Sequence, residues 1–371
     1  MGVGIRNRVS ICPLAAILGV ATSVYGQNTG TDTLSHIYYV GAKAHGGFII
    51  PHTEEIIDVS GSRPIGFQLD FGRMNRTVKA WNKCNCYSQV GFSFAYFNYQ
   101  NPDVLGSSYN LIAYMEPLLT YKPKLNARFR AGAGLTYLTD VYDSDTNPSN
   151  LFFSSSFSGY LMVGFSAHYK LSGHMDTNVG VSYNHISNGG LQHPNKGMNF
   201  PTLNLGLEYR IKPVTVKPQP FKAAVDKRIH PFAGTFGNMR TVESSDAGPT
   251  VNLWQFGVYG GIMKKFTTTN AWIVSSEISH DASVEESGLR QGESVSPWLL
   301  SLMGGHQFCF GRFGFSQQMA WYAYRDYEFR TDFFQRYALT YLVAEKFSFG
   351  FSMKAHGKEA EQMDLRAAFL F

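Results

Sequence analysis

Apolar and polar residues alternate along many short segments of this chain, and this alternation restricts its fold more than any other feature. Successive side chains of a β-strand point to opposite sides, so a strand with one apolar face shows this two-residue period. In segment 175–187, one face carries Val179, Val181 and Tyr183, whereas the other carries asparagine, glycine and serine. Segment 202–209 alternates in the same way, with three leucines and a tyrosine on its apolar face. We therefore expect an all-β protein.

The N-terminus indicates export. Arg6 and Arg8 precede a short apolar stretch, and small residues follow up to Gly26, which predicts a signal peptide over 1–26 and a mature chain that begins at Gln27. Aromatic residues make up 15% of the chain and charged residues 16%, against about 25% charged in a typical globular protein. After the signal peptide, no run of about 20 apolar residues predicts a membrane-spanning helix. This combination favours an antiparallel outer-membrane β-barrel, with a secreted β-sandwich as the soluble alternative.

The C-terminus supports the barrel. Leu365, Ala367, Phe369 and Phe371 lie on one face of the last predicted strand, and Phe371 ends the chain. This ending resembles the signal that the outer-membrane barrel assembly machinery recognises on a terminal strand. The sequence therefore predicts a location in the cell outer membrane and the assembly machinery as a partner.

Sixteen segments have the length and pattern of strands. Because single-chain bacterial barrels have even strand numbers, we expect 14–16 strands in one barrel spanning 27–371. The segment 212–227 contains three prolines, which disfavour strand pairing, and it is the one plausible internal boundary. The alternative is an eight-strand barrel followed by a second β module. The segments lie near 37–50, 63–73, 88–99, 108–122, 125–139, 153–170, 174–187, 198–212, 229–240, 251–264, 270–280, 297–310, 312–324, 332–344, 347–356 and 363–371.

The sequence HISNGGLQHPNKGMNF, residues 185–200, ends the seventh predicted strand and begins the eighth. With both termini in the periplasm, the seventh strand runs outward and the loop after it is extracellular. His185 and Ser187 are two residues apart, so they share the lipid-facing side with Val181. Asn199 shares the corresponding face of the eighth strand with Leu203. Three polar side chains are thus expected to meet outside the barrel, at the height of the lipid headgroups.

Polar groups on a lipid-facing surface are costly, which suggests a function for them. A serine beside a histidine provides a nucleophile and a general base for acyl transfer, and a third group can hold the imidazole in the right tautomer. The oxyanion needs hydrogen-bond donors, which the backbone near Gly189 and Gly190 or the amides of Asn188 and Asn195 can supply. His-x-Ser alone is equally compatible with interfacial polar residues that end a strand and with an Asn-Gly turn.

The complete motif resembles the signature of the outer-membrane lipid A deacylases and acyloxyacyl hydrolases, in which His-x-Ser-Asn-(Gly/Ala) is followed by Pro-Asn-x-Gly. The resemblance extends over most of the mature chain, through segments such as VGFSFAYFNY at 90–99. It implies an esterase that removes an acyl chain from lipopolysaccharide without a cofactor. By position, His185 resembles the general base and Ser187 the nucleophile. The motif also includes Asn188, Gly189, Asn195 and Gly197, and it implies that Asn195 and Gly197 form the oxyanion segment.

The chain departs from this family in two respects. Asn199 stands where the best-known members have a glutamate that orients the histidine. An asparagine can accept a hydrogen bond from an imidazole N–H, but it cannot stabilise the imidazolium by charge. The chain also has about twice the strands of the short, eight-strand members. A non-catalytic channel or surface-interaction barrel on the same scaffold is therefore the alternative function.

Other chemistry is weakly indicated. Without Arg6 and Arg8, 30 basic and 27 acidic residues remain and no like-charged cluster stands out, so we expect no nucleic-acid partner. Asp140, Asp143 and Asp145 fit a calcium loop less well than an ordinary acidic loop. We therefore expect no metal centre. Cys84 and Cys86 are too close in sequence for an easy unstrained bridge, so we expect either free thiols or one unassigned bridge among Cys84, Cys86 and Cys309. The remaining histidines are scattered and suggest no joint site: His36, His45, His52, His168, His174, His193, His230, His280, His306 and His356.

Overall fold

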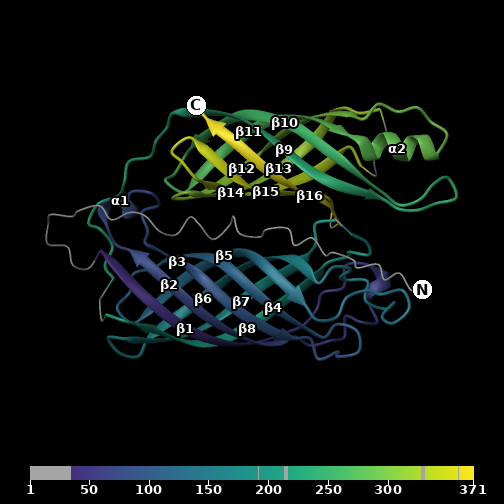
Figure 1. The fold of residues 1–371 in the computed structure, drawn as a ribbon. Coiled ribbons are helices and arrows are strands. Elements are labelled where there is room, and N and C mark those ends of the chain that lie inside the picture. Colours follow the sequence, from purple (N-terminus) through teal and green to yellow (C-terminus); the bar gives the residue numbers. More distant parts are fainter. Residues whose placement is uncertain (1–34, 191, 213–215, 327–330, 358) are drawn as a thin grey trace, which may run out of the picture. The chain divides into compact units, whose positions relative to one another are not determined.

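The computed structural model describes residues 35–190, 192–212, 216–326, 331–357 and 359–371 (Figure 1). The predicted signal peptide, 1–26, lies outside these ranges. The described chain contains sixteen strands, which confirms the all-β prediction and the upper end of the expected strand number. The strands are β1 (His36–Gly47), β2 (Ile65–Asn75), β3 (Ser88–Asn98), β4 (Ser107–Pro117), β5 (Leu125–Leu138), β6 (Phe157–Lys170), β7 (Met175–Ser187), β8 (Met198–Arg210), β9 (Ile229–Val242), β10 (Val251–Lys265), β11 (Asn270–Asp281), β12 (Trp298–Phe310), β13 (Phe313–Tyr324), β14 (Phe333–Leu342), β15 (Phe347–His356) and β16 (Glu359–Leu370).

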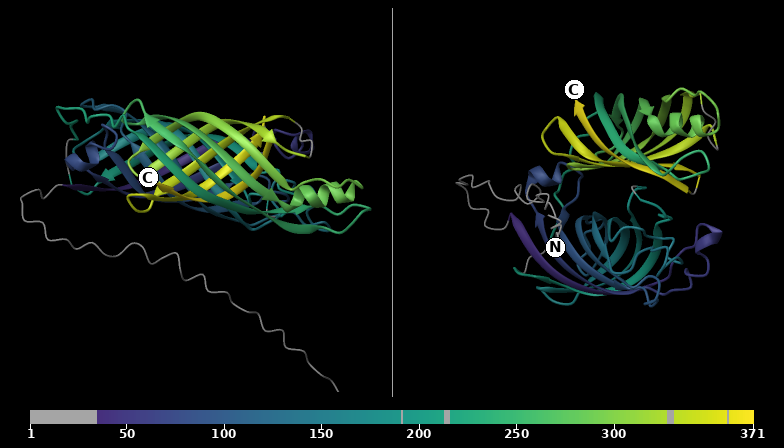
Figure 2. Two further views of the ribbon diagram at one scale, coloured as in Figure 1. Left: turned by 90° about the horizontal axis from the view of Figure 1, so that it is seen from above. Right: turned by 45° about the vertical axis from the view of Figure 1, so that its right-hand side comes forward.

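The strands form two closed antiparallel barrels of eight strands each, β1–β8 and β9–β16 (Figures 1 and 2). The prediction of one large barrel is therefore wrong, and the alternative of an eight-strand half followed by a second β module describes the topology. The first and last strands of each set of eight pair with each other: β1 pairs with β8, and β9 pairs with β16. All edge strands therefore have hydrogen-bonding partners within their own set, and each set closes into a barrel. The proline-containing segment 212–227 falls between β8 and β9.

The predicted faces of the strands are confirmed. The side chains of Val181, Leu203 and Leu205 are 57%, 62% and 64% exposed, whereas Asn184 and Asn204 point inward and are buried. Leu365 and Phe369 are likewise exposed on β16. Large apolar side chains directed outward along the strands are typical of a barrel surrounded by lipid.

Buried side chains fill the interior of the first barrel, as expected for eight strands. In the middle, four cations and four carboxylates form an ion-pair network, which includes the bidentate pair of Arg128 with Glu208 at 2.9 and 3.0 Å. An apolar cluster that includes Phe97, Tyr160 and Phe200 lies toward one end. This filled interior does not favour the alternative of a channel through the first barrel. The charged members of the network are Lys43, Arg128, Arg130, Arg210, Asp70, Glu116, Asp176 and Glu208.

The two ends of the first barrel differ. At one end, which we call the loop end, the connections 48–64, 99–106, 139–156 and 188–197 join the strands. At the other end, the connections 76–87, 118–124 and 171–174 do so, and the first includes helix α1 (Val78–Trp81). The loop end also contains the short 3₁₀ helix η1 (Glu54–Ile56).

The second barrel has its own buried ion-pair network, in which Arg366 contacts Glu277 at 3.0 Å and Asp364 at 2.7 Å. Helix α2 (Ala282–Arg290) connects β11 to β12, and the Asp281 side chain caps its N-terminus by accepting from the Ser283 N–H. Within the described ranges, no helix is long and apolar enough to cross a membrane.

Cys84 and Cys86 form a disulfide, contrary to the expectation from their spacing. Asn85 between them adopts φ 54°, and the two Cα atoms are 5.0 Å apart, within the usual range for a bridged pair. The turn conformation, which a two-residue spacing does not reveal, makes the bridge possible. Cys309 is free and buried.

Candidate active site at the loop end of the first barrel

The predicted site residues lie on the β7–β8 hairpin. His185 and Asn199 are direct cross-strand partners, and Ser187 is the last residue of β7. Their neighbours Ile186 and Met198 point inward and are completely buried in the apolar cluster at the loop end. Because successive residues of a strand alternate, burying Ile186 and Met198 directs His185, Ser187 and Asn199 to the outer face.

A hydrogen bond of 2.7 Å joins His185 Nδ1 to Asn199 Oδ1. An amide oxygen only accepts, so His185 Nδ1 carries the proton and Nε2 has the lone pair. This is the tautomer that a general base needs if Nε2 is to remove a hydroxyl proton. Asn199 therefore has the geometry of the third group expected from the sequence.

Two donors converge on the Ser187 hydroxyl oxygen. Asn195 Nδ2 is 2.9 Å from Oγ, and the Gly189 backbone N–H donates to it with an N–O distance of 3.1 Å. The Asn188 backbone N–H donates to Asn195 Oδ1 at 3.2 Å, which turns the Asn195 amide nitrogen toward Ser187. In acyl transfer the oxyanion forms on the carbonyl oxygen, two bonds from the attacking Oγ, so donors grouped here lie close to where its charge develops.

Unlike the Asn195 amide, the side chain of Asn188 does not contact Ser187. Its Nδ2 donates to Gln192 O at 2.7 Å, and its Oδ1 accepts from the Gly190 N–H at 2.9 Å. These contacts hold the loop 188–197 in shape rather than reaching Ser187. Of the two asparagine amides considered from the sequence, the structure brings Asn195 to the serine and uses Asn188 inside the loop.

Gly197 lies next to both His185 and Ser187. It adopts φ 68°, and a Cβ on it would lie 3.1 Å from His185 Cε1 and 3.5 Å from Ser187 Cβ. Among the described residues, no hydrogen bond joins the imidazole to the Ser187 hydroxyl. Such bonds are often long in free enzymes and tighten when substrate binds, so this geometry is compatible with a serine–histidine pair.

Two other loops support the site, which the sequence did not indicate. The loop 139–156 accepts hydrogen bonds from the hairpin loop, at Leu151 O from the Lys196 N–H and at Phe152 O from the Gly197 N–H. From the loop 48–64, His52 contacts Lys196 O at 2.8 Å through Nε2 and Asn199 Nδ2 at 3.4 Å through Nδ1. His52 was one of the scattered histidines, and no sequence signal links it to Asn199, because 147 positions separate the two.

Asp143 in the loop 139–156 accepts from the Thr146 backbone and hydroxyl and from the Asp145 N–H. These hydrogen bonds hold the pKa of the exposed Asp143 carboxyl below its usual value, and the bond from the Thr146 backbone N–H has the largest effect. Its donors come from its own turn, so this carboxylate already has a structural role there.

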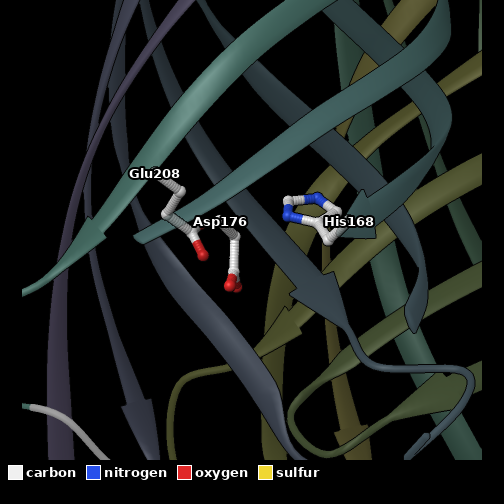
Figure 3. A group of neighbouring side chains, drawn as sticks. All are labelled: His168, Asp176 and Glu208. Atoms are coloured by element: carbon white, nitrogen blue, oxygen red, sulfur yellow. The ribbon is translucent and has the colours of Figure 1, made fainter. Parts of the chain in front are cut away.

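A second polar group lies inside the first barrel. One ligand atom each from His168, Asp176 and Glu208 lies within 4.8 Å of the others, and all three residues are buried (Figure 3). Arg210 pairs with Asp176, and Arg128 binds Glu208 through two hydrogen bonds. A divalent cation would add two positive charges beside these guanidinium groups, so we do not assign a metal site here.

The fold and the site together define an outer-membrane β-barrel protein with an outward-facing group of serine, histidine and asparagine. Residues 67–208 match the family model described as lipid A 3-O-deacylase (PagL), and residues 232–371 match that of the acyloxyacyl hydrolase C-terminal domain. The resemblance to the lipid A deacylase and acyloxyacyl hydrolase family is thus confirmed, each barrel by its own model. This family relation supports a hydrolase of the lipid A deacylase type in the outer membrane.

Solved structures with similar folds include Neisserial surface protein A, which is 13% identical with a TM-score of 0.34 over 46% of this chain and 96% of that one. The outer membrane enzyme PagL is 16% identical, with a TM-score of 0.29 over 45% and 97% of the two chains. The β domain of the Bordetella autotransporter BrkA is 8% identical, with a TM-score of 0.26 over 91% and 99%. A search of curated protein sequences finds no match.

Proposed function

We propose that the first barrel is an esterase that removes an ester-linked acyl chain from lipid A, with Ser187 as nucleophile, His185 as general base and Asn199 as the orienting group. The observation that carries the proposal is the 2.7 Å bond from His185 to Asn199, next to a serine oxygen that accepts from two donors. The description of the family model names the 3-O position, and we extend that position to this chain.

In this mechanism His185 Nε2 takes the Ser187 hydroxyl proton as Oγ attacks the ester carbonyl carbon. The carbonyl π electrons move to oxygen, and Asn195 Nδ2 and the Gly189 N–H stabilise the oxyanion. When the carbonyl re-forms, the bond between the acyl carbon and the sugar oxygen breaks, and His185 gives its proton to the departing sugar oxygen. Water then releases the fatty acid from Ser187 by the same steps, so no cofactor is needed.

The location of the site suits a substrate that stays in the membrane. Below Ser187 the outer face carries Tyr183, Val181 and Leu203, all well exposed. An acyl chain lying along this apolar surface would place its ester linkage at the end of β7, where polar headgroups begin. The hydrolysis can therefore proceed without the lipid leaving the bilayer.

The test is mass spectrometry of lipid A from cells that contain or lack the full-length protein. Wild type should remove an acyl chain, and Ser187→Ala and His185→Ala should each lower the rate on purified lipopolysaccharide by roughly three orders of magnitude or more. Ser155→Ala is the matched control, because Ser155 also lies at the loop end but its hydroxyl donates to Phe157 O and not to a residue of the proposed site. Wild-type activity in both site variants would refute the assignment.

A further inference from the structure

We propose that His52, in the loop between β1 and β2, is a positioning residue that selects the tautomer of His185 by fixing the orientation of the Asn199 amide. His52 does not touch the reacting atoms and acts only through Asn199. The expected effect on the rate rests on the proposed esterase function, whereas the tautomer itself can be measured without any activity.

The first step concerns the protonation of His52. Its Nε2 is 2.8 Å from Lys196 O, and a carbonyl oxygen can only accept a hydrogen bond. His52 Nε2 must therefore carry the proton in this contact. In a neutral imidazole only one ring nitrogen carries a proton, so His52 Nδ1 has a lone pair and acts as an acceptor.

The second step concerns the orientation of Asn199. His52 Nδ1 lies 3.4 Å from Asn199 Nδ2, and an amide nitrogen only donates. An acceptor at this place favours the amide orientation with Nδ2 toward His52. The amide oxygen then faces His185 Nδ1 at 2.7 Å and requires a proton there, which leaves the His185 Nε2 lone pair free.

This support is needed because Asn199 is an asparagine. A carboxylate offers an acceptor oxygen on either side, so turning it by 180° changes nothing. An amide has one accepting and one donating end, and the reversed orientation would point N–H groups at His185 Nδ1. His185 would then carry its proton on Nε2 and could not act as a base. His52 thus fixes the orientation of the amide, which would not need to be fixed if residue 199 were a symmetric carboxylate.

The backbone near His52 is hydrogen-bonded to β8, the strand that carries Asn199. The Ile50 N–H donates to Asn199 O at 2.8 Å, and β1 pairs with β8 along most of its length. Barrel closure therefore brings the loop 48–64 to Asn199, and the contact with Lys196 sets the direction of the ring.

A double-mutant cycle in the full-length protein tests the inference. In wild type, His52→Ala should lower kcat on purified lipopolysaccharide about tenfold with little change in KM, because substrate contacts remain. In the Asn199→Asp background, His52→Ala should cost nothing or increase kcat, because a carboxylate has no wrong orientation. A structural role for His52 would instead give the same loss in both backgrounds, and that result would overturn the inference.

Glu55→Ala is the matched control. Glu55 lies in the same loop and contacts the same residue as His52, but through the Lys196 ammonium at 2.5 Å, and its side chain is 57% exposed. It does not reach Asn199, so its loss should leave kcat unchanged. A loss equal to that of His52→Ala would show that general loosening of the loop, and not the amide orientation, explains the effect.

Nitrogen-15 spectra of histidine-labelled protein in detergent micelles, assigned with His185→Gln, provide the second measurement. Wild-type His185 should show Nδ1 protonated and Nε2 unprotonated, and His52→Ala should give a mixture of tautomers. An unchanged tautomer in His52→Ala would refute the inference. If wild type cleaved no ester at all, the proposed function would fail, whereas these spectra would still decide the role of His52.

Discussion

At the scale of single residues, Asn199 is the group that we propose to prepare His185 as a base. Its oxygen holds the imidazole Nδ1 at 2.7 Å, as an orienting carboxylate would, but it brings no charge to stabilise the imidazolium. If Asn199 has the role of the glutamate that the resemblance implies, it provides the hydrogen bond to His185 without the charge.

We expect Asn199→Ala to lower the rate of acyl release and Asn199→Glu to keep or raise it. A carboxylate would strengthen the hydrogen bond to the charged imidazole. This should lower the activation free energy by about 1–3 kcal/mol. Initial rates on purified lipopolysaccharide measure both variants against wild type. Equal rates for wild type and Asn199→Ala would show that another residue, or none, orients His185.

Gly197 is the second residue whose identity matters. We expect Gly197→Ala to lower kcat, because its Cβ would lie 3.1 Å from His185 Cε1 and displace the imidazole. Gly190→Ala is the matched control: Gly190 also has a positive φ, 83°, but a Cβ there would meet nothing within 4 Å. Both variants should lose roughly 1 kcal/mol of stability from backbone strain, and only Gly197→Ala should lose much activity. Similar rates for the two variants would contradict this role of Gly197.

At the scale of elements, the β7–β8 hairpin is divided between two environments. Its inward residues anchor the apolar cluster at the loop end, and its outward residues are exposed leucines and valines below the site. Because one strand pair supplies both sets, the packing that stabilises the barrel also holds the three polar groups at the loop end.

The lipid-facing side of β8 can be tested with a charge. Leu205 is 64% exposed near the middle of the strand, so Leu205→Arg should destabilise the barrel by about 2–4 kcal/mol in lipid vesicles. Tyr209→Arg, near the strand end, should cost about 0–1 kcal/mol, since the penalty falls toward the interface. Guanidinium unfolding of both variants measures the difference. If Leu205→Arg were as mild as Tyr209→Arg, this face would not be surrounded by lipid.

At the scale of the whole molecule, the chain folds into two barrels, each of which is closed by its own edge strands. The residue pairs of β1 with β8 extend to Arg210, and the Ile211 N–H donates to Tyr38 O. The residues of the candidate site all lie between β1 and β8 or on these strands. The match of residues 232–371 to a separate family model fits this division.

We therefore expect residues 27–212, refolded in detergent, to form a barrel that migrates faster on SDS gels before boiling than after. This barrel should release acyl chains at nearly the rate of the full chain. Refolding in vitro separates folding from assembly in cells, where we propose that the assembly machinery recognises Phe371. Deletion of Phe371 from the full chain should then reduce its level in the outer membrane without preventing refolding. Failure of 27–212 to refold under conditions in which the full chain does would show that the first barrel depends on the second.

The sequence by itself determined the strands and their faces. Alternation places Val181 and Leu203 outward and Asn184 inward, and it puts His185 and Ser187 on one side of β7. These properties depend on the two-residue period of a strand, which is local and can be read without knowing what a strand pairs with. The family motif added roles for residues within a single hairpin, which are also close in sequence.

Only the tertiary structure decided which strands close the barrels and which distant residues reach the site. Edge strands pair through backbone groups that are the same for every residue, so nothing in β1 identifies β8 rather than β16 as its partner. Barrel closure in turn carries His52 to Asn199 across 147 positions of the chain. The contact that completes the site therefore follows from the pairing of the first and eighth strands, which no local pattern encodes.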